Sequence, residues 1–122
     1  MSILRTLAAA FFVLLVTEAS AASKLYISEF AALGTASGAI AQVAQEPEVT
    51  NQLVDFSGGV ASSAAFNTKT SYVRVVCDTQ CAVLFGTAPT ALTSSKLLPA
   101  LLPEYFAVPK GASYKISVIA SP

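Results

Sequence analysis

The amino-acid sequence predicts an all-β protein, a small antiparallel β-sandwich or jelly roll preceded by a hydrophobic, signal-like segment at the N-terminus. Apolar and polar residues alternate with a period of two in three segments, at 25–30, 72–86 and 113–119, as expected for strands with one buried face. Short strands separated by turns that contain glycine and proline are typical of both folds. The 122 residues suggest one domain, and the part after position 21 is long enough to bury a core.

The first 21 residues have the layout of a secretory signal peptide. Arg5 precedes the apolar run "LAAAFFVLLV", and Ala19 and Ala21 occupy the −3 and −1 positions of a small-residue cleavage site. The run is too short for a stable membrane span. The alternative is a gene start placed upstream of the true one. We therefore predict a signal-like segment at 1–21, cleaved or over-extended, and one β-sandwich domain at 22–122.

In the first half of this domain, the sequence pattern predicts strands on either side of a flexible arm. Residues 25–30 alternate and predict the first strand. Residues 31–48, "AALGTASGAIAQVAQEPE", lack bulky anchors, and Gly34 and Gly38 weaken a helix, so we interpret them as an extended arm or long loop. Residues 49–56 predict a second strand that ends at a Ser-Gly-Gly turn, and residues 60–66 a weaker third.

The clearest pattern lies in "SYVRVVCDTQCAVLFG", which predicts a β-hairpin with a three-residue loop at 78–80. Cys77 and Cys81 flank that loop. In an oxidising compartment they can form a disulfide if their β-carbons are close; the alternative is two small buried hydrophobic residues. The chain has no histidine and the spacing is C-x-x-x-C, so we predict neither a metal site nor a redox centre here.

The C-terminal part predicts a loop at 86–95 and two further strands. Residues 104–108 form the first, residues 108–111 a type I turn, and residues 113–119 the last strand. The alternation in the three periodic segments predicts the core residues Val73, Val75, Val83, Phe85, Phe106, Ile116 and Val118.

The stretch "LLPALLP" at 97–103 contains four leucines in a segment that Pro99 and Pro103 keep out of helices and central strands. Apolar side chains in an irregular segment need a cover. They either plug the end of the sandwich or dock onto a neighbouring subunit. The candidate interface residues are Leu97, Leu98, Leu101 and Leu102.

Composition excludes several classes of function. Seven basic and seven acidic residues give zero net charge, so there is no electrostatic footprint for nucleic acid. Without histidine, a Ser-His-Asp or Cys-His catalytic arrangement is impossible within one chain. No spacing of the carboxylates requires an acid–base pair, and we interpret them as surface groups. We interpret Tyr72 and Arg74 as packing residues, because two residues make a weak stacking platform. We predict no catalytic residue, cofactor or metal.

Three segments resemble a family of small structural proteins of tailed phages and prophages: "ASKLYISEF", "YVRVVCDTQCAVLFGTAPTA" and "LPEYFAVPKGASYKISVIA". The resemblance covers about residues 22–122 and implies a small β-rich virion protein of the capsid decoration or cement type. Members of the family begin near a Met-Ala-Ser-Lys start, close to Ala22 here. Phage head proteins assemble in the cytoplasm, so residues 1–21 depart from the family pattern.

Two functions follow from these observations. The first is a non-enzymatic virion protein that forms homo-oligomers and binds a major capsid protein. The second is a secreted or periplasmic β-sandwich binding module with a cleaved signal peptide. An enzyme is a distant third.

Overall fold

The computed structural model describes residues 23–122, and this part of the chain is all-β, with no helix. The predicted all-β class is confirmed. The strands are β1 (Lys24–Phe30), β2 (Leu33–Ala36), β3 (Ala39–Ala44), β4 (Thr50–Asp55), β5 (Ala61–Ser62), β6 (Tyr72–Cys77), β7 (Cys81–Gly86), β8 (Lys96–Leu98), β9 (Glu104–Ala107) and β10 (Lys115–Ala120). The predicted signal-like segment, with Ala19 and Ala21, lies outside the described residues.

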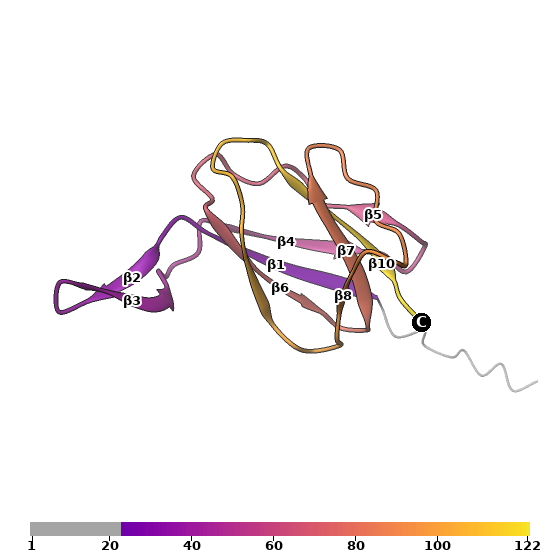
Figure 1. Ribbon diagram of the computed structural model, residues 1–122, viewed down its shortest axis with the longest axis horizontal. Helices are drawn as coiled ribbons and strands as arrows, with labels where there is room; N and C mark the ends of the chain where they lie inside the picture. Colours follow the sequence, from indigo (N-terminus) through magenta and orange to yellow (C-terminus); the bar gives the residue numbers. More distant parts are fainter. Residues whose placement is uncertain (1–22) are drawn as a thin grey trace, which may run out of the picture.

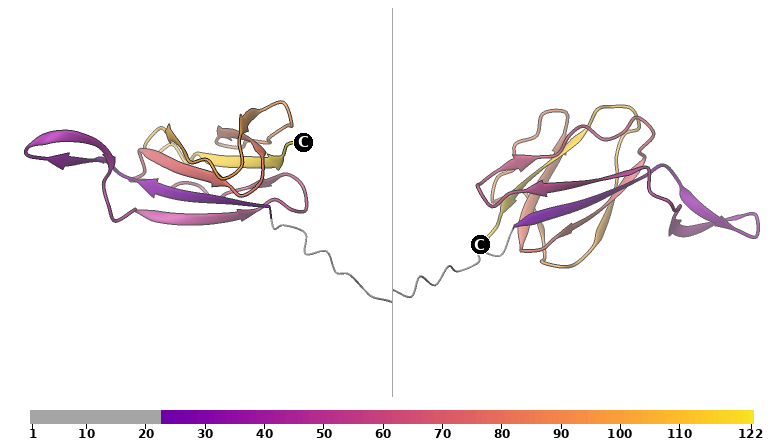
Figure 2. Two further views of the ribbon diagram at one scale, coloured as in Figure 1. Left: turned by 90° about the horizontal axis from the view of Figure 1, so that it is seen from below. Right: turned by 180° about the vertical axis from the view of Figure 1, so that it is seen from behind.

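Two four-stranded antiparallel sheets form the body of the molecule, in the arrangement of a small β-sandwich (Figure 1). The first sheet has the strand order β4-β1-β6-β9, and the second has the order β5-β10-β7-β8. The two layers are seen edge-on in the left view of Figure 2. A separate two-stranded ribbon, β2-β3, projects from one end of the body.

Period-two alternation places the core between the sheets. In β1, Leu25 and Ile27 face inward, and in β10 Ile116 and Val118 do the same. These side chains are almost completely removed from solvent, which is the main stabilising contribution in a domain of this size. The core also contains aromatic and aliphatic residues from the segments that follow the strands, among them Phe56, Phe66 and Val108.

Five of the predicted core residues are buried: Val73, Val75, Val83, Ile116 and Val118. Phe85 and Phe106 are only partly buried at the edge of this cluster. Their ring centroids lie 5.2 Å apart. The ammonium group of Lys96 covers the ring of Phe106 at 4.5 Å, so a cation rather than another apolar side chain closes this edge of the core.

The predicted hairpin at 72–86 is wrong, because its two strands belong to different sheets. β6 pairs with β1 and β9, whereas β7 pairs with β10 and β8. Residues 78–80 carry the chain across the end of the sandwich. Val75 and Val83 nevertheless face the same core, because each sheet turns one face towards the other.

The predicted long loop at 31–48 contains the β2-β3 ribbon. Its register pairs Thr35 with Ile40 and Ala36 with Ala39. Ser37 and Gly38 between them have φ values of 52° and 76°, the left-handed pair that a type I′ hairpin turn requires. The ribbon therefore forms from local turn chemistry, although its side chains are small.

Two smaller predictions shift in position. The predicted strand at 60–66 is reduced to β5, which pairs with β10 through residues 61 and 62. The turn after β9 is one residue later than predicted, because the Val108 amide still donates to the Ser71 carbonyl at 2.9 Å. Gly111, with a φ of 74°, then occupies the third position of a turn closed from Ala112 to Pro109.

Candidate functional site

The β-arm, defined here as residues 31–45, presents apolar side chains to solvent. Ile40 is 73% exposed and Val43 61%, and Leu33 is also exposed. No charged residue occurs between positions 31 and 45. A two-stranded ribbon has no second layer to cover it and is only marginally stable by itself. The β-arm therefore offers an apolar surface that residues 23–122 do not cover.

The base of the β-arm is fastened to the first sheet. The Ser71 hydroxyl donates to the Ala31 carbonyl at 2.6 Å, and the Tyr72 hydroxyl donates to the Ala32 carbonyl at 2.9 Å. The Tyr72 ring stacks on Phe30 with centroids 5.3 Å apart. Burial raises the pKa of Tyr72 above its ordinary value, so its hydroxyl keeps the proton that it donates. The direction of the β-arm is thus set by side chains of the body.

A groove of about 580 Å³ lies between the β-arm and the edge of the first sheet; we call it the arm groove. Leu33 and Val43 line it from the β-arm, and Tyr72, Tyr105 and Phe106 line it from β6 and β9. None of its lining residues is charged. Its volume is in the range of small-molecule sites, but its lining has the composition of an interface core.

The four predicted interface leucines divide into one core residue and three exposed ones. Leu98 is 1% exposed, because β8 places it inside the sandwich opposite Cys81; it is a plug and cannot lie at an interface. Leu97, Leu101 and Leu102 are exposed. The segment crosses from β8 in the second sheet to β9 in the first, held by a bond from the Leu101 amide to the Cys77 carbonyl at 2.8 Å.

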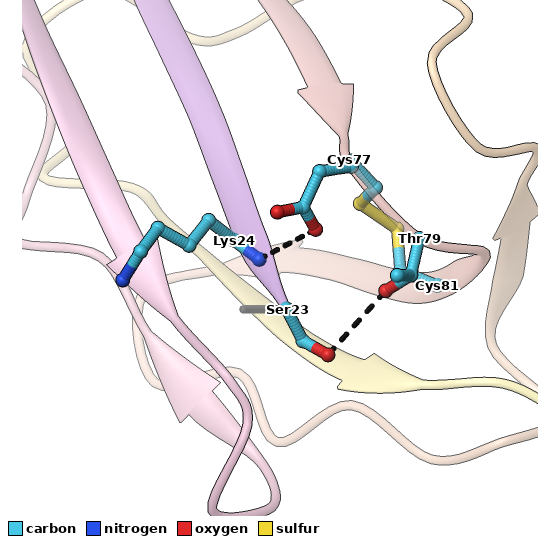
Figure 3. Close-up of a disulfide and its surroundings, with 6 residues drawn as sticks. Ser23, Lys24, Cys77, Thr79 and Cys81 are labelled. Atoms are coloured by element: carbon cyan, nitrogen blue, oxygen red, sulfur yellow. Dashed lines mark hydrogen bonds between the residues drawn. A yellow bond between two sulfur atoms is a disulfide. The ribbon is translucent and has the colours of Figure 1, made fainter. Parts of the chain in front are cut away.

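Cys77 and Cys81 are joined by a disulfide that links the two sheets at the 78–80 turn (Figure 3). Both residues are completely buried. The same turn binds both ends of the described chain. The Lys24 amide donates to the Asp78 carboxylate at 2.7 Å, and the Ser121 amide donates to the Gln80 carbonyl at 3.2 Å. This end of the sandwich, opposite the β-arm in Figure 1, is cross-linked and closed.

Glu29 corrects the interpretation of the carboxylates as surface groups, since its side chain is fully buried. One carboxylate oxygen accepts bonds from the Asn67 amide at 2.7 Å and the Thr70 hydroxyl at 2.8 Å, and the other accepts from the Gln52 side chain at 3.0 Å. Three hydrogen bonds therefore satisfy this buried side chain. Glu29 thereby holds the 63–71 loop, which ends at the residues that fasten the β-arm.

Sequence reasoning missed Glu29 because its donors lie far away along the chain. The available signal was its position, since it continues the inward row of Leu25 and Ile27. A carboxylate on the apolar face of a strand needs buried partners.

The outer face of the first sheet carries the other exposed aromatic residues. Tyr105 lies opposite Arg74 in the register of β6 and β9, and its ring is 6.5 Å from that of Tyr72. Tyr105 therefore lies beside the Tyr72–Arg74 pair that the sequence singles out. Near Arg74, a hydrogen bond of 2.7 Å from Asn51, supported by Ser28, lowers the pKa of Glu48. This face mixes polar side chains with the exposed apolar groups of Tyr26 and Leu53, and it lacks a buried side-chain donor or acceptor without a partner.

Residues 23–122 contain no cluster of three or more carboxylate or thiol groups arranged to hold a metal ion. Within that range, no helix has the length and apolar character needed to cross a bilayer. The chain matches no protein-family model, and comparisons with curated proteins and with solved structures gave no match.

Proposed function

We propose that this chain is a non-enzymatic structural protein of a tailed-phage particle, where it decorates or cements the capsid. It binds its own copies and a major capsid protein through protein–protein contacts. The observation that carries the proposal is the uncharged β-arm, whose apolar side chains the described part of the chain leaves exposed. The sequence resemblance to small phage proteins is the reason for proposing a phage particle as the assembly.

The exposed leucines support assembly through a second surface. Leu101 is 73% exposed, and Leu97 and Leu102 lie within the same proline-broken segment. Contiguous apolar groups on a protein surface mark interaction sites. The β-arm and this segment lie on different parts of the molecule, so one can contact a copy of the chain while the other contacts the capsid protein. The proposal assigns no catalytic residue, cofactor or metal.

A second candidate function is a secreted or periplasmic binding module, and the disulfide favours it. Disulfides persist in oxidising compartments and are rare in the cytoplasm, where phage heads assemble. Cleavage after Ala21 is the processing that the small-residue site at Ala19 and Ala21 predicts. The Cys77–Cys81 bond and the signal layout therefore support the same alternative.

Analysis of the native source separates the two functions. Phage particles are purified on a density gradient, and both the particles and the particle-free culture fluid are analysed by intact-mass spectrometry. The virion proposal expects the chain in the particle fraction in fixed ratio to the major capsid protein. Recovery only outside particles, with an N-terminus at Ala22, would overturn it in favour of export.

A further inference from the structure

We infer that the β-arm of one copy docks into the arm groove of a second copy, and that the exchange is reciprocal. Ile40, near the tip of the β-arm, is the residue that enters the groove. The inference deepens the proposed assembly function, on which it rests only in requiring contacts between copies. It identifies the partner of this surface as the same chain.

The chemistry of the two surfaces matches. The β-arm has no charged residue, and none lines the groove. Association therefore buries apolar groups without removing an ion from water, which is the costly step at most interfaces. The chain as a whole has zero net charge, so two copies approach without net repulsion.

Both halves of the contact belong to one chain, and this favours a second copy as the occupant. The groove lies at the base of the same β-arm that would fill it, between Val43 and Tyr105. Two copies related by a two-fold axis can each insert the tip of the β-arm beside the base of the other. Such isologous contacts close on themselves and give dimers, the commonest symmetric assembly.

Backbone groups strengthen this pairing. β9 is an outer strand of the first sheet, and both strands of the β-arm have one unpaired edge. Natural edge strands are commonly protected by lysine, proline or inward-pointing charge. Residues 31–45 contain none of these protective residues, so an incoming strand can extend the hydrogen-bonded ladder.

The fastened base reduces the cost of docking. Ser71 and Tyr72 hold the first residues of the β-arm through bonds of 2.6 and 2.9 Å. The β-arm consequently projects in a set direction before a partner arrives. Preorganisation of this kind lowers the entropy lost on association.

The test is the oligomeric state of the protein expressed from the full 122-residue sequence. Sedimentation equilibrium of the wild type should give a dimer. Ile40→Asp should raise the dimer dissociation constant roughly 30-fold or more, since the new carboxylate is buried only on association. Leu92→Asp is the matched control: Leu92 is 62% exposed, lies in the loop after β7, and should leave the dimer unchanged.

Folding is checked by far-UV circular dichroism, and Ile40→Ser is the milder variant if Ile40→Asp is insoluble.

A second measurement, disulfide cross-linking between two copies, tests the docking geometry directly. Ile40→Cys and Ala107→Cys are made in separate proteins and mixed under mild oxidation. Docking in the arm groove expects a disulfide-linked species that contains one copy of each. A monomeric wild type, a dimer unaffected by Ile40→Asp, or no mixed species would overturn the inference. If the protein forms the dimer but is not found in phage particles, the proposed virion function is refuted and the docking inference stands.

Discussion

The two ends of the sandwich differ in how their apolar residues are covered. At the turn that contains the disulfide, Leu98, Cys77 and Cys81 are fully buried, and main-chain bonds tie both termini of the described chain to residues 78–80. At the opposite end, the β-arm leaves Ile40 and Val43 in solvent. The described residues cover the core of the disulfide end, where Leu97, Leu101 and Leu102 stay exposed at the surface, and leave the β-arm largely uncovered.

The difference follows from the number of layers at each end. The body has two sheets that cover each other, whereas the β-arm is a single ribbon. A single layer needs a further element to bury its side chains, and residues 23–122 supply none for the β-arm. We therefore expect changes in the buried residues of the closed end to alter the stability of the subunit, and changes in the β-arm to alter association.

Leu98 gives the largest expected effect. Leu98→Ala should lower the free energy of unfolding by about 2–5 kcal/mol, because it removes a buried side chain and leaves a cavity. Urea denaturation followed by circular dichroism measures the loss. Leu101→Ala is the control, since Leu101 lies three residues away and is exposed, and should change stability by less than about 0.5 kcal/mol. Equal losses would contradict the division of the leucines into one plug and three surface residues.

Glu29 extends the comparison to the end that bears the β-arm, where it is a buried polar fastening. Glu29→Ala removes the acceptor of three hydrogen bonds, one from the buried Thr70 hydroxyl and two partly buried ones from the Asn67 main chain and the Gln52 side chain. Each unsatisfied group costs about 1–3 kcal/mol, and water entering the vacated space offsets part of the total, so we expect a loss of about 3 kcal/mol. Thermal unfolding measures it. Glu29→Gln keeps the volume and one acceptor oxygen and should lose less; a greater loss for Gln than for Ala would refute the role of the carboxylate.

Much of the body could be predicted from the sequence, because burial of one sheet face imposes a period of two. β1, β4, β6, β7, β9 and β10 all lie within or close to predicted segments. The pairing of β6 and β7 could not be predicted. A three-residue link looks alike whether it closes a hairpin or crosses between sheets, and the choice depends on distant partners such as Leu25 for Cys77 and Ala120 for Cys81.

The candidate site was harder to predict than the body. Most side chains of the β-arm are small and its larger ones, Leu33, Ile40 and Val43, are exposed. Burial therefore imposes no alternation on it, and only the Ser37-Gly38 turn signal was available. The arm groove joins β3 to β9, which are more than 50 residues apart in the sequence. The leucine segment was visible because proline excludes regular structure, but only the strand pairing of β8 separates Leu98 from the other three.

Reduction of the disulfide tests the closed end next. The bond closes a ring of only five residues, from Cys77 to Cys81, so chain entropy accounts for about 2 kcal/mol of stability at most. Urea unfolding with and without tris(2-carboxyethyl)phosphine should differ by that amount. The Cys77→Ala/Cys81→Ala double variant should not respond to the reductant. Because the bond is remote from the β-arm, the oligomeric state of folded protein should be the same in both conditions. A reductant-induced monomer that remains folded would show that the two ends are coupled.

The smallest expected effect on stability is that of acid, which protonates Asp55 in the body of the molecule. Hydrogen bonds from the Ser57 side chain and backbone, together with the Lys24 ammonium at 3.1 Å, lower the pKa of Asp55 from its ordinary 3.8 to about 2. A pKa that is lower in the folded state gives a stabilising contribution above pH 4, which is lost as the pH falls towards 2. The melting temperature of the wild type should therefore fall more steeply across this window than that of Asp55→Asn, and the difference should be small because Asp55 is exposed. Residues 31–45 have no ionisable side chain with a pKa in this range, so association through the β-arm should respond equally to acid in both proteins. A dimer that dissociates in acid only in the wild type would place Asp55 at the interface and contradict the separation of the two ends.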